Sequence, residues 1–134
     1  MIDAYLALVA MLRNINSIEQ LKDAIYPDFL PSDAALPAIV YTDIGLEREQ
    51  SRYQPSGAYS VTFQVTVWAQ QRLKIEEIAA QIILGIDRQS GVFGGIAVDD
   101  VIVQDAAAIK EPDSLLLGKA IDIEVFIVES RAIY

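Results

Sequence analysis

Three aspartates in one predicted strand are the first residues whose spacing could support chemistry. Asp99, Asp100 and Asp105 could ligate a hard cation such as Mg²⁺ or Ca²⁺, because such cations prefer oxygen ligands. Neighbouring residues of a strand point to opposite faces, however, so Asp99 and Asp100 diverge. Their spacing also matches no EF-hand loop. Solvated charges at a strand end are the interpretation that we favour.

A second pair of carboxylates, Asp122 and Glu124, lies two residues apart and therefore on one face of a predicted strand. Two carboxylates separated by about 5 to 10 Å can act as an acid and a base. No further catalytic partner accompanies them, so we interpret them as part of a polar sheet surface that faces solvent or a channel. Another predicted strand adds further residues to this polar face: Thr62, Gln64 and Thr66.

The remaining chemistry is limited by residue types that the chain lacks. It contains no Cys and no His, which excludes disulfides, thiolate and imidazole metal ligands, and Ser-His-Asp or Cys-His catalysis. Gly94-Gly95 lacks the Lys and Ser/Thr of a phosphate-binding loop and the spacing of a dinucleotide fingerprint, so it predicts a plain turn. We expect no enzymatic activity, no cofactor and no metal site.

Length and composition predict one acidic domain that covers residues 1–134. Hydrophobic residues make up 53% of the chain and the mean hydropathy is +0.32, which favours oligomerisation. No apolar run approaches the roughly 20 residues of a membrane span, and the N-terminus lacks the pattern of a signal peptide. The net charge of −9 disfavours binding to nucleic acid, although it does not prevent DNA from passing.

Three regions have the patterns of helices or of their connections. Apolar residues at helical spacing predict a helix over residues 2–12: Ile2, Tyr5, Leu6, Val9 and Leu12. A short second helix is predicted from residue 17 to about residue 25, and three prolines then favour an extended connection over residues 26–37. An amphipathic helix is predicted over residues 73–87, with an apolar stripe of Ile75, Ile78, Ala79, Ile82, Ile83 and Ile86.

Alternating residues predict strands over residues 38–44, 58–69, 96–109 and 119–130, the third of them bent or bulged around Asp99-Asp100. The apolar faces of the second and fourth strands are Val61, Phe63, Val65 and Val67, and Ile121, Ile123, Val125 and Ile127. The predicted fold is α+β: an antiparallel sheet of about four strands, with the amphipathic helix packed on one face and one or two N-terminal helices beside it.

The charged stretch EREQSRYQPSG, residues 47–57, separates the first two predicted strands. A bare hairpin needs only about two to five residues, so we predict a long hairpin arm. Arg48, Arg52 and Tyr53 are candidate contacts to a partner or to another copy of the chain, because Arg and Tyr are favoured at interfaces. The alternative is a solvated hairpin tip.

The order of these features resembles the tail-completion family of long-tailed phages and prophages, which includes tail-terminator and head–tail joining proteins. The segments that carry the resemblance are Tyr26-Pro27, LPAIVY at residues 36–41, VTVWA at residues 65–69, the amphipathic helix, and DIEVFIVES at residues 122–130. Together they extend over nearly the whole chain.

The resemblance implies a structural virion protein, located at the tail–neck junction and assembled in the cytoplasm of the bacterial host. It implies a homo-oligomeric ring, usually a hexamer, that caps the tail tube protein, stops tube polymerisation and docks to a neck or head-completion protein. DNA passes through such a ring without specific binding, and no membrane is involved. The polar face with Asp122 and Glu124 would line the lumen or border a subunit contact, and residues 47–57 would reach a neighbouring subunit, the tail tube or the neck.

Three alternatives stay open at this point. One is another phage protein, either a neck or head-closure protein or a tail-tube subunit. The form of the assembly is the discriminating observation: a single closed ring favours a tail terminator, and an open tube favours a tube subunit. Another is a small acidic ligand-binding domain or enzyme, which needs a pocket with convergent polar groups. The third is a generic oligomeric interaction protein, which the composition alone would support.

Overall fold

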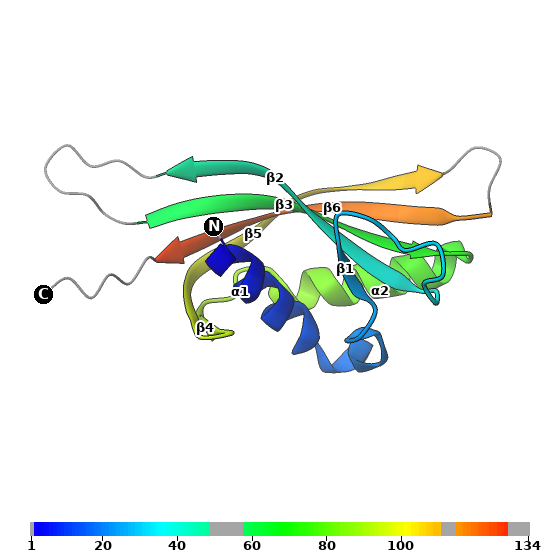
Figure 1. The fold of residues 1–134 in the computed structure, drawn as a ribbon, viewed down its shortest axis with the longest axis horizontal. Coiled ribbons are helices and arrows are strands. Elements are labelled where there is room, and N and C mark those ends of the chain that lie inside the picture. The colour runs from blue at the N-terminus through cyan, green and yellow to red at the C-terminus, as the bar shows by residue number, and fades with distance from the viewer. Residues whose placement is uncertain (1, 49–57, 111–114, 129–134) are drawn as a thin grey trace, which may run out of the picture.

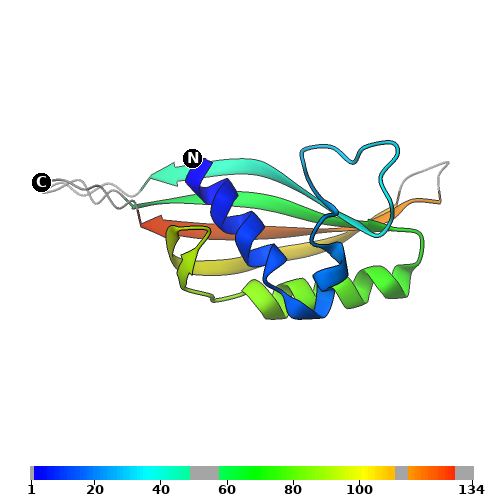
Figure 2. The same ribbon diagram turned by 60° about the horizontal axis from the view of Figure 1, so that its bottom comes forward.

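The computed structural model describes residues 2–48, 58–110 and 115–128 of the chain. They form two layers: a six-stranded sheet, and helices that cover one of its faces (Figure 1 and Figure 2). In chain order the elements are α1 (Ile2–Arg13), a 3₁₀ helix η1 (Asn16–Leu21), β1 (Ile25–Pro27), β2 (Ala38–Arg48), β3 (Ala58–Ala69), α2 (Arg72–Ile86), β4 (Gly91–Phe93), β5 (Ile96–Lys110) and β6 (Leu117–Val128). None of the helices in these ranges has the length and apolar character that a membrane crossing needs.

The strand order in the sheet is β1-β2-β3-β6-β5-β4. The α+β class and the antiparallel central strands β2, β3, β6 and β5 are as predicted, but the predicted number of about four strands is wrong. The described residues also form two three-residue strands, of which β1 is parallel to β2 and β4 is antiparallel to β5. Segments this short show no alternation, so sequence periodicity could not reveal them.

Strand β2 is longer than predicted and includes the start of the expected hairpin arm. It continues past a bulge near Gly45 to Arg48, so Glu47 and Arg48 are strand residues whose backbone pairs with β3. The rest of the expected arm, residues 49–57 with Arg52 and Tyr53, lies outside the described residues. The arm therefore stays a prediction, and the second predicted helix is reduced to the 3₁₀ helix η1.

The hydrophobic core lies between the sheet and the helices α1 and α2. Strands β3 and β6 each send every second side chain into it, as their alternation predicts. The most deeply buried residues from these strands and from α2 are Val61, Phe63, Val65, Val67, Ile121, Ile123, Val125, Ile127, Ile75, Ile82 and Ile86. The predicted stripe of α2 thus faces the sheet, with Ile83 only partly buried at its margin.

Helix α1 buries only part of the predicted stripe: Leu12 is buried and Tyr5 and Val9 pack against the core. The sequence predicts a stripe that includes Ile2 and Leu6, yet these side chains are 70% and 50% exposed. The buried residues of the helix are Ala4, Ala7, Leu8, Met11 and Leu12, of which only Leu12 belongs to the predicted stripe. The β4–β5 turn also comes close to the helix, since a Cβ added to Gly94 would lie 3.0 Å from Leu6 O. Ala4 and Ala7 allow the helix to pack closely on this face. The spacing of large apolar residues in the sequence does not reveal such close packing.

A polar contact orients α2 on the sheet. Lys119 of β6 places its Nζ 2.7 Å from Oε1 of Glu76, and Arg72 donates to the carbonyl oxygens of Gly118 and Ile109. The hydrogen bond from Lys119 holds the pKa of Glu76 below its usual range. Because the Glu76 side chain is 41% exposed, solvent screens the pair, and the contact sets geometry more than it adds stability.

Gly118 of β6 leaves room for the indole ring of Trp68 in β3. The two residues face each other in the ladder, and a Cβ added to Gly118 would lie 2.8 Å from ring atoms of Trp68. We expect Gly118→Val to lower the free energy of unfolding by about 1–3 kcal/mol, because the ring must move. Urea unfolding followed by the fluorescence of this single tryptophan measures the loss.

Gly45→Val is the matched control, since nothing lies within 4 Å of a Cβ built there. Valine favours strands, so strand propensity alone cannot explain a loss at either position. An equal loss in both variants, or no loss in Gly118→Val, would contradict this account of the Trp68 contact.

Candidate functional site

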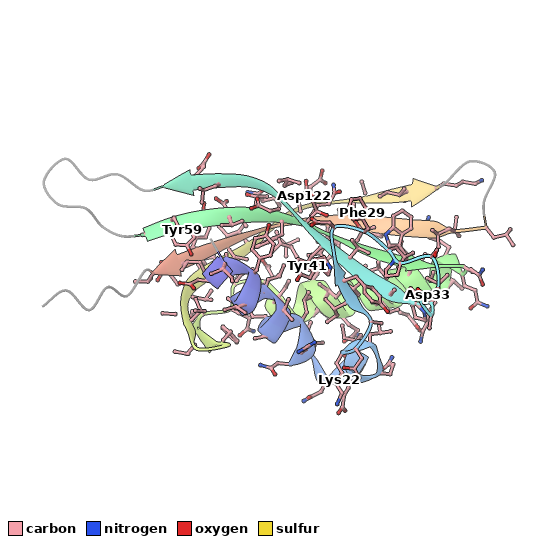
Figure 3. All side chains as sticks on the ribbon, in the orientation of Figure 1. Lys22, Phe29, Asp33, Tyr41, Tyr59 and Asp122 are labelled. Atoms are coloured by element: carbon pink, nitrogen blue, oxygen red, sulfur yellow. The ribbon has the colours of Figure 1, made fainter. Side chains whose placement is uncertain are left out.

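The sheet face opposite the helices is the candidate site, and the register of the central strands defines it. In the β3–β6 ladder Thr62 lies opposite Glu124, and Gln64 lies opposite Asp122. Thr66 follows two residues further along β3. Paired residues of an antiparallel ladder point to the same side, so the five predicted residues share this open face. Figure 3 labels Asp122 on the side of the sheet away from the helices.

Strand β5 adds Asp105 to the open face, which the sequence analysis missed. In the β5–β6 ladder Asp105 lies directly opposite Asp122. A bulge at Gln104 shifts the register by one residue, and this shift turns Asp105 to the open side. Strict alternation from Asp100 would place Gln104 there and turn Asp105 toward the helices. Only the position of the bulge could have revealed that Asp105 shares a face with Asp122.

The other aspartates of β5 are surface charges of a strand. Asp99 is the extra residue of a bulge between Val98 and Asp100, as the sequence predicts. Asp100 accepts a hydrogen bond from the amide of Val101 and lies 3.1 Å from the guanidinium of Arg88. Within the described ranges, no group of three or more carboxylates could hold a metal ion.

Two hydrogen bonds hold Glu124 against the sheet. Ser60 Oγ donates to one carboxylate oxygen at 2.7 Å, and Gln104 Nε2 donates to the other at 2.8 Å. Ser60 is only 5% exposed, so its hydroxyl depends on this partner in place of water. The negative charge of Glu124 is therefore fixed on the open face instead of moving freely in solvent.

Carboxylates dominate the charge of the open face. The ladders place Glu47, Asp100 and Asp105 on it together with Asp122 and Glu124. Like charges that face each other across a ladder cost free energy, and Asp105 and Asp122 do so. A surface that accepts this cost is suited to repelling phosphate groups rather than to binding them.

A loop covers one end of the open face. Residues 28–36 fold over β2 and β3 and border an open hollow of about 640 Å³. The lining of the hollow includes Phe29, Leu36, Val40, Trp68, Ile109 and Leu115. Phe29, labelled in Figure 3, is 81% exposed on this loop, whereas Thr66, which lines the same hollow, is 6% exposed. The predicted polar face is thus shielded at Thr66 and more open at Asp122 and Glu124.

Comparisons with known proteins identify a family and a similar fold. The model of the family described as "Tail completion protein gp17" matches residues 6–127. A chain of the solved structure "Virion of native gene transfer agent (GTA) particle" has a similar fold, with a TM-score of 0.65 and 12% sequence identity. That match covers 90% of this chain and 91% of the other. No curated protein sequence matches the chain.

The like-charged pair across β5 and β6 predicts a variant that is more stable than the unsubstituted chain. We expect Asp105→Asn to raise the free energy of unfolding by about 0.2–1 kcal/mol, because it removes the repulsion with Asp122. The carboxamide oxygen of the substituted side chain would still accept from the amide of Ala106, which lies 2.8 Å from Asp105 Oδ1. The gain should shrink at about 1 M salt, where charges are screened.

Urea unfolding at low and high salt measures the gain. Asp23→Asn is the matched control, because Asp23 is an exposed carboxylate outside the sheet. The account predicts no change in this control. A gain of equal size in both variants, or no gain in Asp105→Asn, would show that the two carboxylates do not repel each other on the open face.

Proposed function

Because the chain belongs to the tail completion protein gp17 family, we propose that it assembles into a ring that caps the tail tube of a phage or phage-like particle. Family membership gives the chain a structural role in a phage tail. The ring stops tube polymerisation, docks to a neck or head-completion protein and leaves a central passage for DNA. It acts in the virion at the tail–neck junction and catalyses no reaction.

The observation that carries this proposal is the difference between the two faces of the sheet. Helices α1 and α2 bury one face, whereas the other presents Asp105, Asp122 and Glu124. DNA moves through a passage only if the wall does not bind its phosphates, and a wall of carboxylates repels them. The net charge of −9 supports the same role. In the proposed ring this open face lines the lumen.

The fold similarity to a chain from a gene transfer agent virion supports a place in a particle of this kind. Tail-tube subunits and head-closure proteins are the alternatives within the same class. A tube subunit polymerises into open tubes of varying length, whereas a cap forms closed rings of one size. The resemblance to tail terminators makes a hexamer the proposed stoichiometry.

Reversing the charge of the open face tests the proposed passage for DNA. We expect the double variant Asp122→Lys with Glu124→Lys to assemble rings, although each copy loses some free energy of unfolding because the Ser60 hydroxyl loses its acceptor. The yield of particles that deliver DNA should fall roughly tenfold or more, because each copy then offers lysines to the phosphates. Native mass spectrometry measures assembly, and a DNA-transfer assay measures delivery.

The control is the neutral pair Asp122→Asn with Glu124→Gln, which removes the charge without adding a phosphate ligand. It should deliver DNA nearly as well as the unsubstituted chain. Undiminished delivery by the lysine variant would exclude the open face as the wall of the passage. An equal loss in both variants would point to a structural defect instead.

Residues 47–57 are the proposed contact to a neighbouring subunit, the tail tube or the neck, with Arg48, Arg52 and Tyr53 as the contacting residues. Replacing residues 49–57 by Asn-Gly should leave the free energy of unfolding within roughly 1 kcal/mol, because shortening a loop changes closure entropy only slightly. The same change should abolish assembly, which native mass spectrometry measures. A Gly-Ser segment of the original length is the control, because it keeps the length of the segment and removes its side chains. Unchanged assembly with the short turn would show that the segment is only a solvated loop.

A further inference from the structure

Strand β2 has an outer edge that is covered over only part of its length. Strand β1 pairs with it at Ile39–Tyr41. Among the described residues, no strand pairs with the outer side of residues 42–48. Within this stretch Ile44 and Leu46 are 51% and 43% exposed. Within the ranges that the structure describes, the backbone groups that point outward here have no strand partner.

Strand β5 forms the opposite edge of the central strands and is covered over its other half. Strand β4 pairs with it only at Ile96–Val98, and the turn after α2 bonds to its backbone as far as Val103. The strands in the described ranges leave the outer side of residues 105–110 without a partner. The centre of this stretch is the run Ala106-Ala107-Ala108-Ile109.

The free stretch of β5 carries little of the protection that edge strands usually have, whereas the free stretch of β2 includes Asp43, Glu47 and Arg48. Natural edge strands are commonly blocked by Pro, by charged side chains or by a covering loop, because open edges pair with other chains. In β5 the only Lys of the free stretch is Lys110 at its end, and the alanines allow another backbone to come close. The amide of Ala106 is bound by the neighbouring Asp105, so pairing would use the backbone beyond it.

The two free stretches lie at opposite ends of the sheet as well as on opposite edges (Figure 1). The centre of the free β2 stretch, Gly45, lies at the level of Thr62 in β3 and Glu124 in β6. The centre of the free β5 stretch, Ala107, lies at the level of Ala120 in β6 and Thr66 in β3. Along the unshifted strand β3 these two levels are four residues apart, from Thr62 to Thr66, which is roughly 13 Å, and the four central strands span roughly 19 Å. Copies joined through these edges are therefore staggered so that their strands tilt by about 35°, at the lower end of the range of roughly 35–45° for closed barrels.

We propose that a second copy of this chain pairs its β2 edge, residues 42–48, with the β5 edge, residues 105–110, of its neighbour. The inference rests on the ring of the proposed function and supplies its subunit contact. The two edges are different surfaces, so the contact is head-to-tail, the type that can close into a ring. Strands β2 and β5 run in opposite directions in the sheet, so the pairing between copies is antiparallel.

This pairing explains two other features of the molecule. It continues one sheet around the ring, so the helices lie on one side of the ring wall and the face with Asp122 and Glu124 lies on the other, which the proposed function assigns to the lumen. Antiparallel pairing also brings the start of the β2 stretch, with Asp43, to the end of the β5 stretch, with Lys110. Opposite charges then meet at one end of the contact.

Cross-linking tests the contact directly, because the chain has no cysteine of its own. Leu46 and Ala108 both point to the helix side of their strands, so they become cross-strand neighbours in the proposed pairing. Within one copy β3 and β6 separate them by roughly 14 Å, beyond the approximately 7 Å that a disulfide allows between Cα atoms. We expect the full-length double variant Leu46→Cys with Ala108→Cys to form a ladder of covalent oligomers on oxidation. The ladder should end at the size of the ring.

The double variant Leu46→Cys with Ala106→Cys tests the alternative register between copies, in which Leu46 lies opposite Ala106 in place of Ala108. Leu73→Cys with Leu84→Cys is the matched control, because both leucines of α2 are exposed, at 82% and 75%, and lie away from the edges. A ladder in this control would attribute cross-linking to random collision. No ladder in either edge variant would overturn the proposed pairing.

Ala108→Pro gives a second test that does not depend on oxidation. The amide of Ala106 donates to the carboxylate of Asp105, so we infer that it points away from β6, and Ala108 has the same orientation two residues further on. A proline at position 108 therefore spares the β5–β6 ladder and removes an outward donor. We expect the concentration needed for ring formation to rise at least roughly tenfold, since each hydrogen bond lost between copies is repeated around the ring. Circular dichroism checks that the monomer keeps its fold.

The two proposals fail in different ways. Rings of the unsubstituted chain in native mass spectrometry, together with no edge cross-link and no effect of Ala108→Pro, would overturn the edge pairing and leave the cap function intact. A chain that stays monomeric even with tail tubes added would overturn the cap function and the edge pairing together.

Discussion

The register between β3 and β6 is the constraint on which the rest of the structure depends. Their ladder runs without a shift from Ala58 opposite Val128 to Ala69 opposite Leu117, so side chains alternate strictly between two faces. A slip of one residue would exchange Ile123 with Glu124 and bury a carboxylate in the core. The hydrophobic core and the acidic surface are therefore two consequences of one register.

The strands on either side of this ladder adapt to it through bulges. The bulge at Gln104 turns Asp105 toward Asp122 and lets Gln104 itself donate to Glu124. The bulge near Gly45 carries β2 onward to the level of Ser60. Both outer strands extend past their short partners β1 and β4, and these extensions are the edges through which copies are proposed to join. The same sheet thus supplies the wall of the passage and the contact that closes the ring.

The sequence predicts what depends on regular alternation and misses what depends on close approach or irregularity. The apolar faces of β3, β6 and α2 follow directly from residues such as Phe63, Ile123 and Ile82. The buried face of α1 does not, because packing favoured Ala4 and Ala7 over the larger Ile2 and Leu6. Asp105 joined the open face only through a bulge. Three-residue strands such as β1 have too few residues for a pattern, and the fold of residues 28–36 over Trp68 depends on contacts distant in sequence.

The central claim is that copies of this chain form a ring whose lumen is lined by the open face of the sheet. An electron cryo-microscopy map of the assembled protein on tail tubes tests it most directly. The account predicts one closed ring at the end of each tube, with Asp122 and Glu124 facing the lumen and α1 and α2 on the outside. A ring lined by the helices, or a protein distributed along the whole tube, would contradict it.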